Sequence, residues 1–276
     1  MCGIVGYAGN VRTACGKPLE VCLQGLQRLE YRGYDSAGVA LTAPGMERVA
    51  VRKKAGRLAN LVQDIERDPM PDATVGIGHT RWATNGVPND TNAHPHTSRD
   101  GKVAIIHNGI IENYVEIKEF LIGQGIRFKS ETDTEVVAQL LEFYYNECHD
   151  FLEAVGRVLR RIEGAYALGM LCADCPDRII AARKDAPLLL GYGKGCNFLA
   201  SDVTAIIKHT RDVAYMEDGE VAVLTRDGIE VYDALEQKVE KKHFTIDWEV
   251  SAAEKGGYQH FMLKEIMEQP EALRRA

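Results

Sequence analysis

The order in which strands and helices follow one another is the feature of this sequence that most limits its fold. Helical periodicity at 113–123, 133–146 and 151–162 gives three helices in succession, whereas short apolar runs between Asp/Gly turns give a series of strands over 165–233. Earlier strands are predicted at 3–8, 36–42, 47–53, 75–79 and 103–107. Because a doubly wound parallel sheet needs regular alternation of strands and helices, the pattern predicts an α+β layered sandwich.

Cys2 is the residue that most strongly indicates a catalytic function. A small residue after Met1 permits removal of that methionine, and the chain would then begin with a cysteine whose thiol and α-amine belong to one residue. Their ordinary pKa values, about 8.5 and about 7.7–8.0, allow the amine to accept the thiol proton near neutral pH. Such a residue is a nucleophile that carries its own base. The alternative is that Cys2 is only a small residue ahead of a buried strand.

Composition and cysteine usage exclude several classes of protein. The net charge of −7 argues against a nucleic-acid-binding surface, and no apolar stretch approaches membrane-spanning length. The seven cysteines are irregularly spaced, and no export signal is evident, so we expect free thiols in a cytoplasmic protein. Cys172 and Cys175 have the spacing of half a metal site, but no second pair completes it, and no metal is expected.

The composition and periodicity of the sequence change after about residue 240. Residues 246–260 are small and polar and are interpreted as a linker, and 261–276 begin a helical pattern. We therefore expect one domain over residues 1–245, with 246–276 as a linker and the start of a further domain.

Three polar clusters interrupt the apolar strands. The first cluster, residues 79–86, contains Arg81, which can bind a carboxylate through two hydrogen bonds. Asn108 and Gly109 offer a side-chain amide and a backbone N–H, the paired donors of an oxyanion hole. The third cluster, at 130–134, begins a helix; capping is its plain interpretation, and Thr132 with Glu135 predicts a capping box. Together with Cys2, these groups fit an amino-acid substrate whose side-chain carbonyl is attacked.

Several runs of residues resemble one family. They are Met1–Gly6, Leu29–Gly38, His79–Thr84, Asn92–His96, His107–Asn113, Ser130–Glu135 and Lys264–Pro270. These runs are similar to the glutaminase domain, a class II glutamine amidotransferase, of the glucosamine-6-phosphate synthases, also called glutamine–fructose-6-phosphate aminotransferases (isomerizing). The resemblance implies an N-terminal-nucleophile hydrolase fold, a four-layer αββα sandwich with two stacked antiparallel sheets.

The resemblance also implies roles for individual residues. Cys2 matches the nucleophile that attacks the glutamine side-chain amide, and the oxyanion hole matches Asn108 and Gly109. Arg81 matches the ligand of the substrate α-carboxylate, with Thr84 and Asn85 beside it. The ligand of the α-ammonium group matches Asp133.

Five positions carry less direct expectations. Trp82 matches a residue at the mouth of an ammonia channel, and Arg32 and His94 are expected to organise the site from behind. Many members of the family have His where this chain has Asn85, which is harmless if the position contributes backbone contacts only. His107 is a rival general base in a Cys–His mechanism, but a histidine at a buried strand end is more often a hydrogen-bonded structural residue.

The function implied is hydrolysis of L-glutamine to supply ammonia. In the full-length enzyme, the ammonia would convert fructose 6-phosphate to glucosamine 6-phosphate, and the enzyme would be a homodimer through its sugar-isomerase domains. No cofactor is expected, because glutamine hydrolysis needs none. The alternatives are the glutaminase domain of another class II amidotransferase, such as an amidophosphoribosyltransferase, and a non-catalytic glutamine-binding module.

Overall fold

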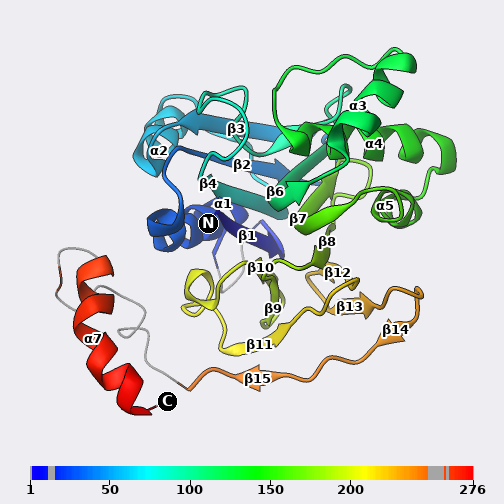
Figure 1. The fold of residues 1–276 in the computed structure, drawn as a ribbon. Coiled ribbons are helices and arrows are strands. Elements are labelled where there is room, and N and C mark those ends of the chain that lie inside the picture. The colour runs from blue at the N-terminus through cyan, green and yellow to red at the C-terminus, as the bar shows by residue number, and fades with distance from the viewer. Residues whose placement is uncertain (1, 12–15, 248–257, 259–260, 276) are drawn as a thin grey trace.

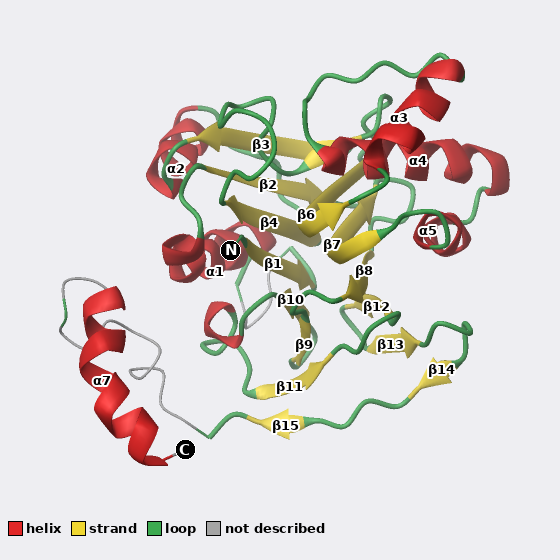
Figure 2. Ribbon diagram, viewed as in Figure 1, coloured by secondary structure: helices red, strands yellow, loops and turns green. Residues whose placement is uncertain are grey.

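The computed structural model describes residues 2–11, 16–247, 258 and 261–275. Its strands form two sheets in which all neighbouring strands are antiparallel (Figure 2). The eight-stranded sheet has the order β15 (Phe244–Thr245), β11 (Asp212–Tyr215), β9 (Leu189–Tyr192), β10 (Asn197–Ala200), β1 (Gly3–Ala8), β4 (Val75–Arg81), β2 (Ser36–Thr42) and β3 (Ala50–Ala55). The seven-stranded sheet has the order β14 (Lys238–Val239), β13 (Ile229–Tyr232), β12 (Val221–Thr225), β8 (Arg178–Lys184), β7 (Gly164–Cys172), β6 (Val103–Ile111) and β5 (His96–Thr97).

Helices cover the outer face of each sheet (Figure 1). The eight-stranded sheet is covered by α1 (Pro18–Leu29) and α2 (Leu58–Arg67), and two 3-10 turns, η1 (Glu30–Arg32) and η2 (Val203–Ala205), lie near α1. The seven-stranded sheet is covered by α3 (Tyr114–Gly123), α4 (Asp133–Cys148) and α5 (Phe151–Leu159).

Three buried clusters of apolar side chains separate the four layers. One joins α1 and α2 to the eight-stranded sheet, one joins α3–α5 to the seven-stranded sheet, and one lies between the sheets. Strands that bury both faces need apolar residues at nearly every position, and β1, β2 and β4 are buried along their whole length. The predicted α+β sandwich, with four layers in the order αββα, is confirmed.

Two strands are longer than the sequence predicted. β4 continues through Arg81 because residues 79–81 pair with β1 and β2, and β6 continues through Ile111 because residues 108–111 pair with β7. The first residues of the polar clusters at 79–86 and 108–109 therefore lie within the sheets and not beyond the ends of the strands. Ladder pairing therefore fixes their backbone positions.

One expectation about the cysteines is wrong. Cys196 is disulfide-bonded, whereas Cys2, Cys22, Cys148, Cys172 and Cys175 are free thiols. Spacing along a chain does not reveal which thiols the fold brings within the narrow range that a disulfide requires.

The helix predicted after residue 260 is present as α7 (Phe261–Arg275), which stands outside the sandwich (Figure 1). The fate of Met1 and most of the predicted linker, at 248–257 and 259–260, lie outside the described residues. None of the described helices combines the length and apolar composition needed to cross a bilayer.

Candidate active site

Cys2 and two side chains of β4 share the face of the eight-stranded sheet that looks toward the other sheet. Ile4 of β1 lies opposite His79 of β4, and Ile4 packs in the core between the sheets. Since side chains alternate along a strand, Cys2 lies on the face of Ile4, and Arg81 lies on the face of His79. The predicted nucleophile and the predicted carboxylate clamp therefore open into the same space.

The Cys2 thiol is held by the backbone at the end of β4. The Trp82 N–H donates a hydrogen bond to the Cys2 Sγ at 3.2 Å, and the thiol lies 3.5 Å from the Trp82 carbonyl oxygen. Burial raises the pKa of Cys2 above its ordinary value, while the Trp82 N–H and the charges of Arg81 and Arg32 act to lower it. A thiol with a raised pKa holds little thiolate at neutral pH, so a nucleophilic Cys2 needs a base beside it.

Asn108 reaches the nucleophile from the other sheet. It lies opposite Ala167 of β7, a residue of the core between the sheets, so its side chain points toward the eight-stranded sheet. The Asn108 Nδ2 donates a hydrogen bond to the Cys2 carbonyl oxygen at 3.1 Å. A side-chain amide donor is thereby fixed beside the nucleophile, as an oxyanion hole requires.

His79 fixes the orientation of that amide. Its Nε2 lies 3.0 Å from the Asn108 Oδ1 and 3.0 Å from the His107 carbonyl oxygen. Both oxygens are acceptors, so Nε2 carries the proton and donates. Burial lowers the pKa of His79 to about 3, and the ring stays neutral. Sequence reasoning did not single out this residue; only its place two residues before Arg81, on the same strand face, could have indicated it.

Gly109 occupies a position that only glycine can fill. Its φ is 131°, and a Cβ there would stand 2.0 Å from the Ala165 carbonyl oxygen. No side chain therefore covers the Gly109 backbone, which is exposed next to the Asn108 amide. This is the place where the sequence predicted the second oxyanion donor.

Arg81 is a buried cation with one donor atom that has no partner among the described residues. The side chain is 3% exposed, and its Nη2 donates hydrogen bonds to the carbonyl oxygens of Asn85 and Gly86. Its Nη1 is buried and has no hydrogen-bond partner among the described residues. A buried donor on a cation is costly to leave unpaired, so this atom suits an incoming carboxylate.

Asp133 lies at the first turn of α4, beside the end of β6. Its carboxylate is 7% exposed, and one oxygen, Oδ2, accepts a hydrogen bond from the Ile111 N–H at 2.8 Å. Electrostatic interaction with Asp133 opposes the lowering of the Arg81 pKa that burial causes. The chain thus holds a carboxylate within electrostatic range of the arginine, as an amino-acid substrate with two opposite charges requires.

The segment that follows β4 carries the other predicted substrate contacts. Asn85 contributes its backbone carbonyl oxygen to Arg81, which is the kind of contact that tolerates a change of side chain. Thr84 is exposed in the same segment. Trp82 is 45% exposed, and its ring lies edge-on to that of Tyr34, with centroids 5.6 Å apart.

The residues expected to organise the site from behind have different surroundings. Arg32 donates a hydrogen bond to the Asp202 carboxylate at 2.8 Å and acts on Cys2 through its charge. His94 packs against the ring of His79 with centroids 4.3 Å apart, and its Nε2 lies 2.9 Å from the Thr134 Oγ1. His94 therefore supports the residue that supports Asn108.

His107 is turned away from the nucleophile. It lies opposite Leu168 of β7, which packs under the helices of the seven-stranded sheet, and its Nδ1 lies 2.9 Å from the Thr134 Oγ1 of α4. Its neighbour Asn108 points the opposite way, as alternation along a strand demands. The interpretation of His107 as a structural residue is favoured over a Cys–His mechanism.

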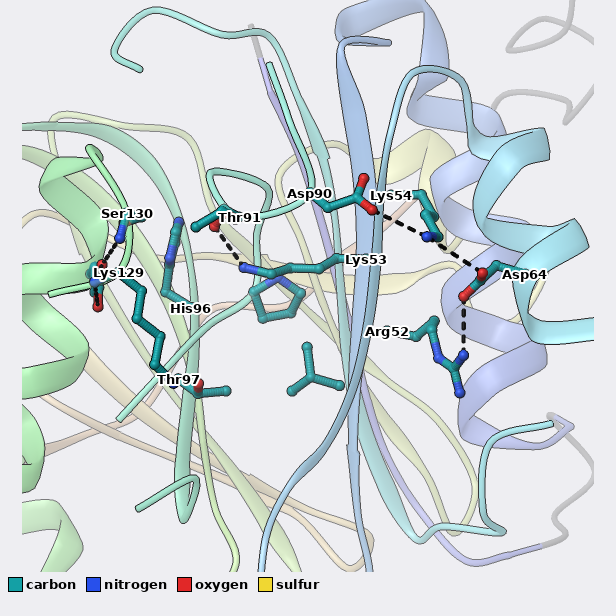
Figure 3. A pocket seen from close by; sticks show the side chains of 13 residues that line it. Arg52, Lys53, Lys54, Asp64, Asp90, Thr91, His96, Thr97, Lys129 and Ser130 are labelled. Atoms are coloured by element: carbon teal, nitrogen blue, oxygen red, sulfur yellow. Dashed lines mark hydrogen bonds and ion pairs between the residues drawn. The ribbon is translucent and has the colours of Figure 1, made fainter. Parts of the chain in front are cut away.

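A cavity of about 590 Å³ is lined by residues of β3, by residues near β5 and by residues just before α4, and Cys2 is not among them (Figure 3). Its walls include Lys53, whose Nζ donates hydrogen bonds to the carbonyl oxygens of Thr91 and Ala93 at 3.0 and 2.7 Å. Burial lowers the pKa of Lys53 to about 8. Neither Cys2 nor Arg81 lines this cavity, so the candidate active site is not part of it.

Comparison with known proteins gives a consistent result. Residues 79–208 match the family model described as "Glutamine amidotransferase domain". The chain is 54% identical over 274 residues to a glutamine–fructose-6-phosphate aminotransferase (isomerizing) of Caldanaerobacter subterraneus subsp. tengcongensis, and 52% identical over 270 residues to one of Thermus thermophilus. These alignments cover 99% and 98% of this chain but 43% of each relative. The resemblance read from the sequence is confirmed, and the chain spans less than half the length of these curated relatives.

Solved structures share the architecture. A Bacillus subtilis glutamine phosphoribosylpyrophosphate amidotransferase complexed with ADP and GMP is 25% identical, with a TM-score of 0.71 over 84% of this chain and 49% of that one. A glutamine aminotransferase class-II domain protein from Silicibacter pomeroyi is 13% identical, with a TM-score of 0.54 over 84% of this chain and 99% of that one, and shows the fold alone.

Proposed function

We propose that this chain, which carries a glutamine amidotransferase domain, hydrolyses the side-chain amide of L-glutamine with Cys2 as the nucleophile. The observation that carries the proposal is the meeting of three groups between the sheets. The Cys2 thiol lies directly before β1, the Asn108 amide comes from β6, and the Arg81 guanidinium, with its unpaired Nη1, comes from β4. A nucleophile, an oxyanion donor and a carboxylate clamp are the parts that acyl transfer from an amino acid requires.

The chemistry follows from those parts. The Cys2 sulfur attacks the amide carbon, and the oxygen that becomes negative accepts hydrogen bonds from the Asn108 Nδ2 and the Gly109 N–H. The carbon–nitrogen bond breaks, ammonia leaves with the proton taken from the thiol, and a thioester remains. Water then cleaves the thioester, giving glutamate and the free thiol.

The base in this mechanism is the α-amine of Cys2, released when Met1 is removed. Burial raises the pKa of the thiol, so an unassisted thiolate would be scarce at neutral pH. His79 is kept neutral by burial and donates its only ring N–H within the protein, and His107 faces α4. The amine is therefore the group best suited to accept the proton.

Substrate recognition in the proposal uses two opposite charges. Arg81 binds the α-carboxylate through its unpaired Nη1, and Asp133 binds the α-ammonium group through the oxygen that Ile111 leaves free. Thr84 and the carbonyl of Asn85 border the same place. In the proposal Trp82 borders the path of the departing ammonia; its backbone N–H contacts the thiol and its side chain is 45% exposed.

The acceptor is proposed from the relatives. With 54% identity to glutamine–fructose-6-phosphate aminotransferases, against 25% to the phosphoribosylpyrophosphate amidotransferase, fructose 6-phosphate is the favoured acceptor in a full-length homodimer. Residues 1–245 would form the glutaminase domain, and 246–276 would lead to a sugar-isomerase domain. The apolar side chains that α7 exposes support this division: Met262, Leu263, Ile266, Met267 and Leu273. A cytoplasmic location is part of the proposal; the five free cysteines favour it, although the disulfide at Cys196 is unusual in a reducing compartment.

The test is covalent labelling with a glutamine analogue that carries an electrophilic side chain. We expect labelling at Cys2 alone, loss of glutamate formation in Cys2→Ala, and normal activity in the matched control Cys148→Ser. Intact mass identifies the first residue of the protein, because retained Met1 would leave a glutamine-binding module without turnover. Labelling at another cysteine, or substantial turnover by Cys2→Ala, would contradict the proposal.

The proposed domain division has its own test. Residues 1–276 should form glutamate and ammonia from glutamine but no glucosamine 6-phosphate when fructose 6-phosphate is added. Amino-sugar formation, or a clear increase in hydrolysis on adding the sugar phosphate, would place an acceptor site within these residues and contradict the division.

A further inference from the structure

Cys172 and Cys175 bracket a tight turn at the end of β7, far along the strand from the oxyanion residues. The Cys175 N–H donates a hydrogen bond to the Cys172 carbonyl oxygen at 3.1 Å, which closes a turn of four residues. Such a turn keeps its first and last Cα atoms within about 7 Å, close to the 4.4–6.8 Å that disulfides span. Both residues are free thiols. The two thiols are close enough to influence each other's pKa: the interaction between them raises the pKa of Cys172 and lowers that of Cys175.

The middle of this turn is fastened to the rest of the protein. The Ala173 N–H donates to the Lys102 carbonyl oxygen at 2.8 Å, and the Asp174 carboxylate pairs with the Lys102 ammonium group at 2.9 Å. The Tyr145 hydroxyl lies 3.2 Å from the same carboxylate. These contacts involve neither sulfur, so the turn is held in place by groups that a change at the thiols leaves intact.

The two thiols differ in access and in acidity. Cys172 is fully buried, whereas Cys175 is partly exposed. The interaction with the Cys172 thiol and the nearby charge of Arg178 lower the pKa of Cys175 to about 7, although its burial acts in the opposite direction. By contrast, burial raises the pKa of Cys22 to about 12. Cys175 has the accessible, thiolate-rich character of an attacking cysteine, and Cys172 stands behind it as a resolving thiol.

We propose that Cys172 and Cys175 form a reversible dithiol–disulfide couple that reacts with low-molecular-weight disulfides. The Cys175 thiolate attacks one sulfur of such a disulfide, forming a mixed disulfide and releasing one thiolate. The Cys172 thiol then loses its proton and attacks the Cys175 sulfur, releasing the second thiolate. Overall, the protein dithiol is oxidised by two electrons, and one small disulfide is reduced to two thiols.

A metal site is the rival use of this pair. Structural zinc sites need four ligands, and the part of the chain that the structure describes brings no group of three or more His, Cys, Asp or Glu side chains together as ligands. The pair is therefore assigned to redox chemistry.

The two cysteines lie in one tryptic peptide, residues 162–178, which contains no other Lys or Arg before Arg178. The folded protein is incubated with oxidised glutathione at pH 7, free thiols are alkylated, and the mass of the tryptic peptide is measured. A peptide with the internal disulfide carries no alkyl group and is lighter than the unmodified dithiol peptide by two hydrogen atoms. Dithiothreitol should restore the dithiol. Cys172→Ala, which keeps a small apolar side chain in the core, should trap glutathione on Cys175, whereas Cys175→Ser should leave Cys172 unmodified.

The synthetic peptide 162–178 serves as the unfolded reference. At pH 7, a thiol with a pKa near 7 is about sixteenfold richer in thiolate than one near 8.5, and its lower nucleophilicity offsets about fivefold of this gain. Cys175 in the folded protein should therefore react about threefold faster than in the peptide. Slower reaction than in the peptide, no mixed disulfide in a folded Cys172→Ala variant, or no internal disulfide in the wild type would overturn the proposal. Melting temperatures establish that each variant is folded.

Discussion

Removing the hydrogen bond from His79 to Asn108 should lower kcat without a comparable change in KM. His79 is fully buried, and its Nε2 is the group that holds the Asn108 Oδ1, at 3.0 Å, so the bond sets which end of the amide faces the substrate. His79→Phe keeps a ring of similar size but has no donor. His79→Gln keeps an amide N–H in the same region and serves as the matched control.

The expected size follows from the contacts. A single neutral hydrogen bond contributes about 0.5–1.5 kcal/mol, which corresponds to a roughly two- to tenfold fall in kcat. Removal of an oxyanion donor itself costs about 10²–10³ in kcat, so Asn108→Ala should be far more damaging than His79→Phe. His79→Gln should recover most of the activity.

A double-mutant cycle tests the reasoning, with glutamate formation assayed over a range of glutamine concentrations. If His79 acts through Asn108, His79→Phe should have no further effect in the Asn108→Ala background. Equal losses in both backgrounds would show that His79 acts by another route, and unchanged kcat in His79→Phe would show that the bond does not orient the amide. Urea unfolding establishes that the variants are folded at the assay temperature.

Three further outcomes are expected. Arg81→Ala and Asp133→Ala should each weaken glutamine binding by roughly 2–5 kcal/mol. A glutamine analogue without the α-carboxylate or α-ammonium group should lose the least affinity in the variant that already lacks the side chain binding that group. A normal KM in either variant would mean that the pocket is misplaced. Asn85→His should change glutamine binding by no more than about 0.5 kcal/mol, because the position contributes its backbone oxygen, and a larger change in KM would assign a role to the side chain. The free energy of unfolding should fall as pH drops below about 6.5, by about 1.4 kcal/mol per pH unit for each affected histidine, because histidines in the unfolded chain bind protons that the buried rings do not bind. Urea titrations between pH 7 and 5 measure the slope. A flat profile would contradict the lowered pKa values of His79, His94, His96 and His107.

The sequence by itself determined the elements and much of the layer order. Apolar periodicity located α3–α5 and most of the central strands, and the Thr132 side chain accepts a hydrogen bond from the Glu135 N–H, as the capping box predicted. The Glu135 carboxylate, however, binds the N–H groups of Lys129 and Ser130 and not that of Thr132. The two-residue strands β5, β14 and β15 escaped prediction because so short a run carries no periodicity.

Only the tertiary structure decided which polar groups meet. Asn108 touches Cys2 across 106 residues of sequence, and His79 acquires its role because β4 and β6 lie in different sheets that face each other. The disulfide at Cys196 and the direction of the His107 side chain, toward α4, likewise depend on tertiary structure. Periodicity records which face of an element is buried, since that depends on near neighbours in the chain. The distance between two strands of opposing sheets depends instead on register and on the packing of the core between them, which no local pattern encodes.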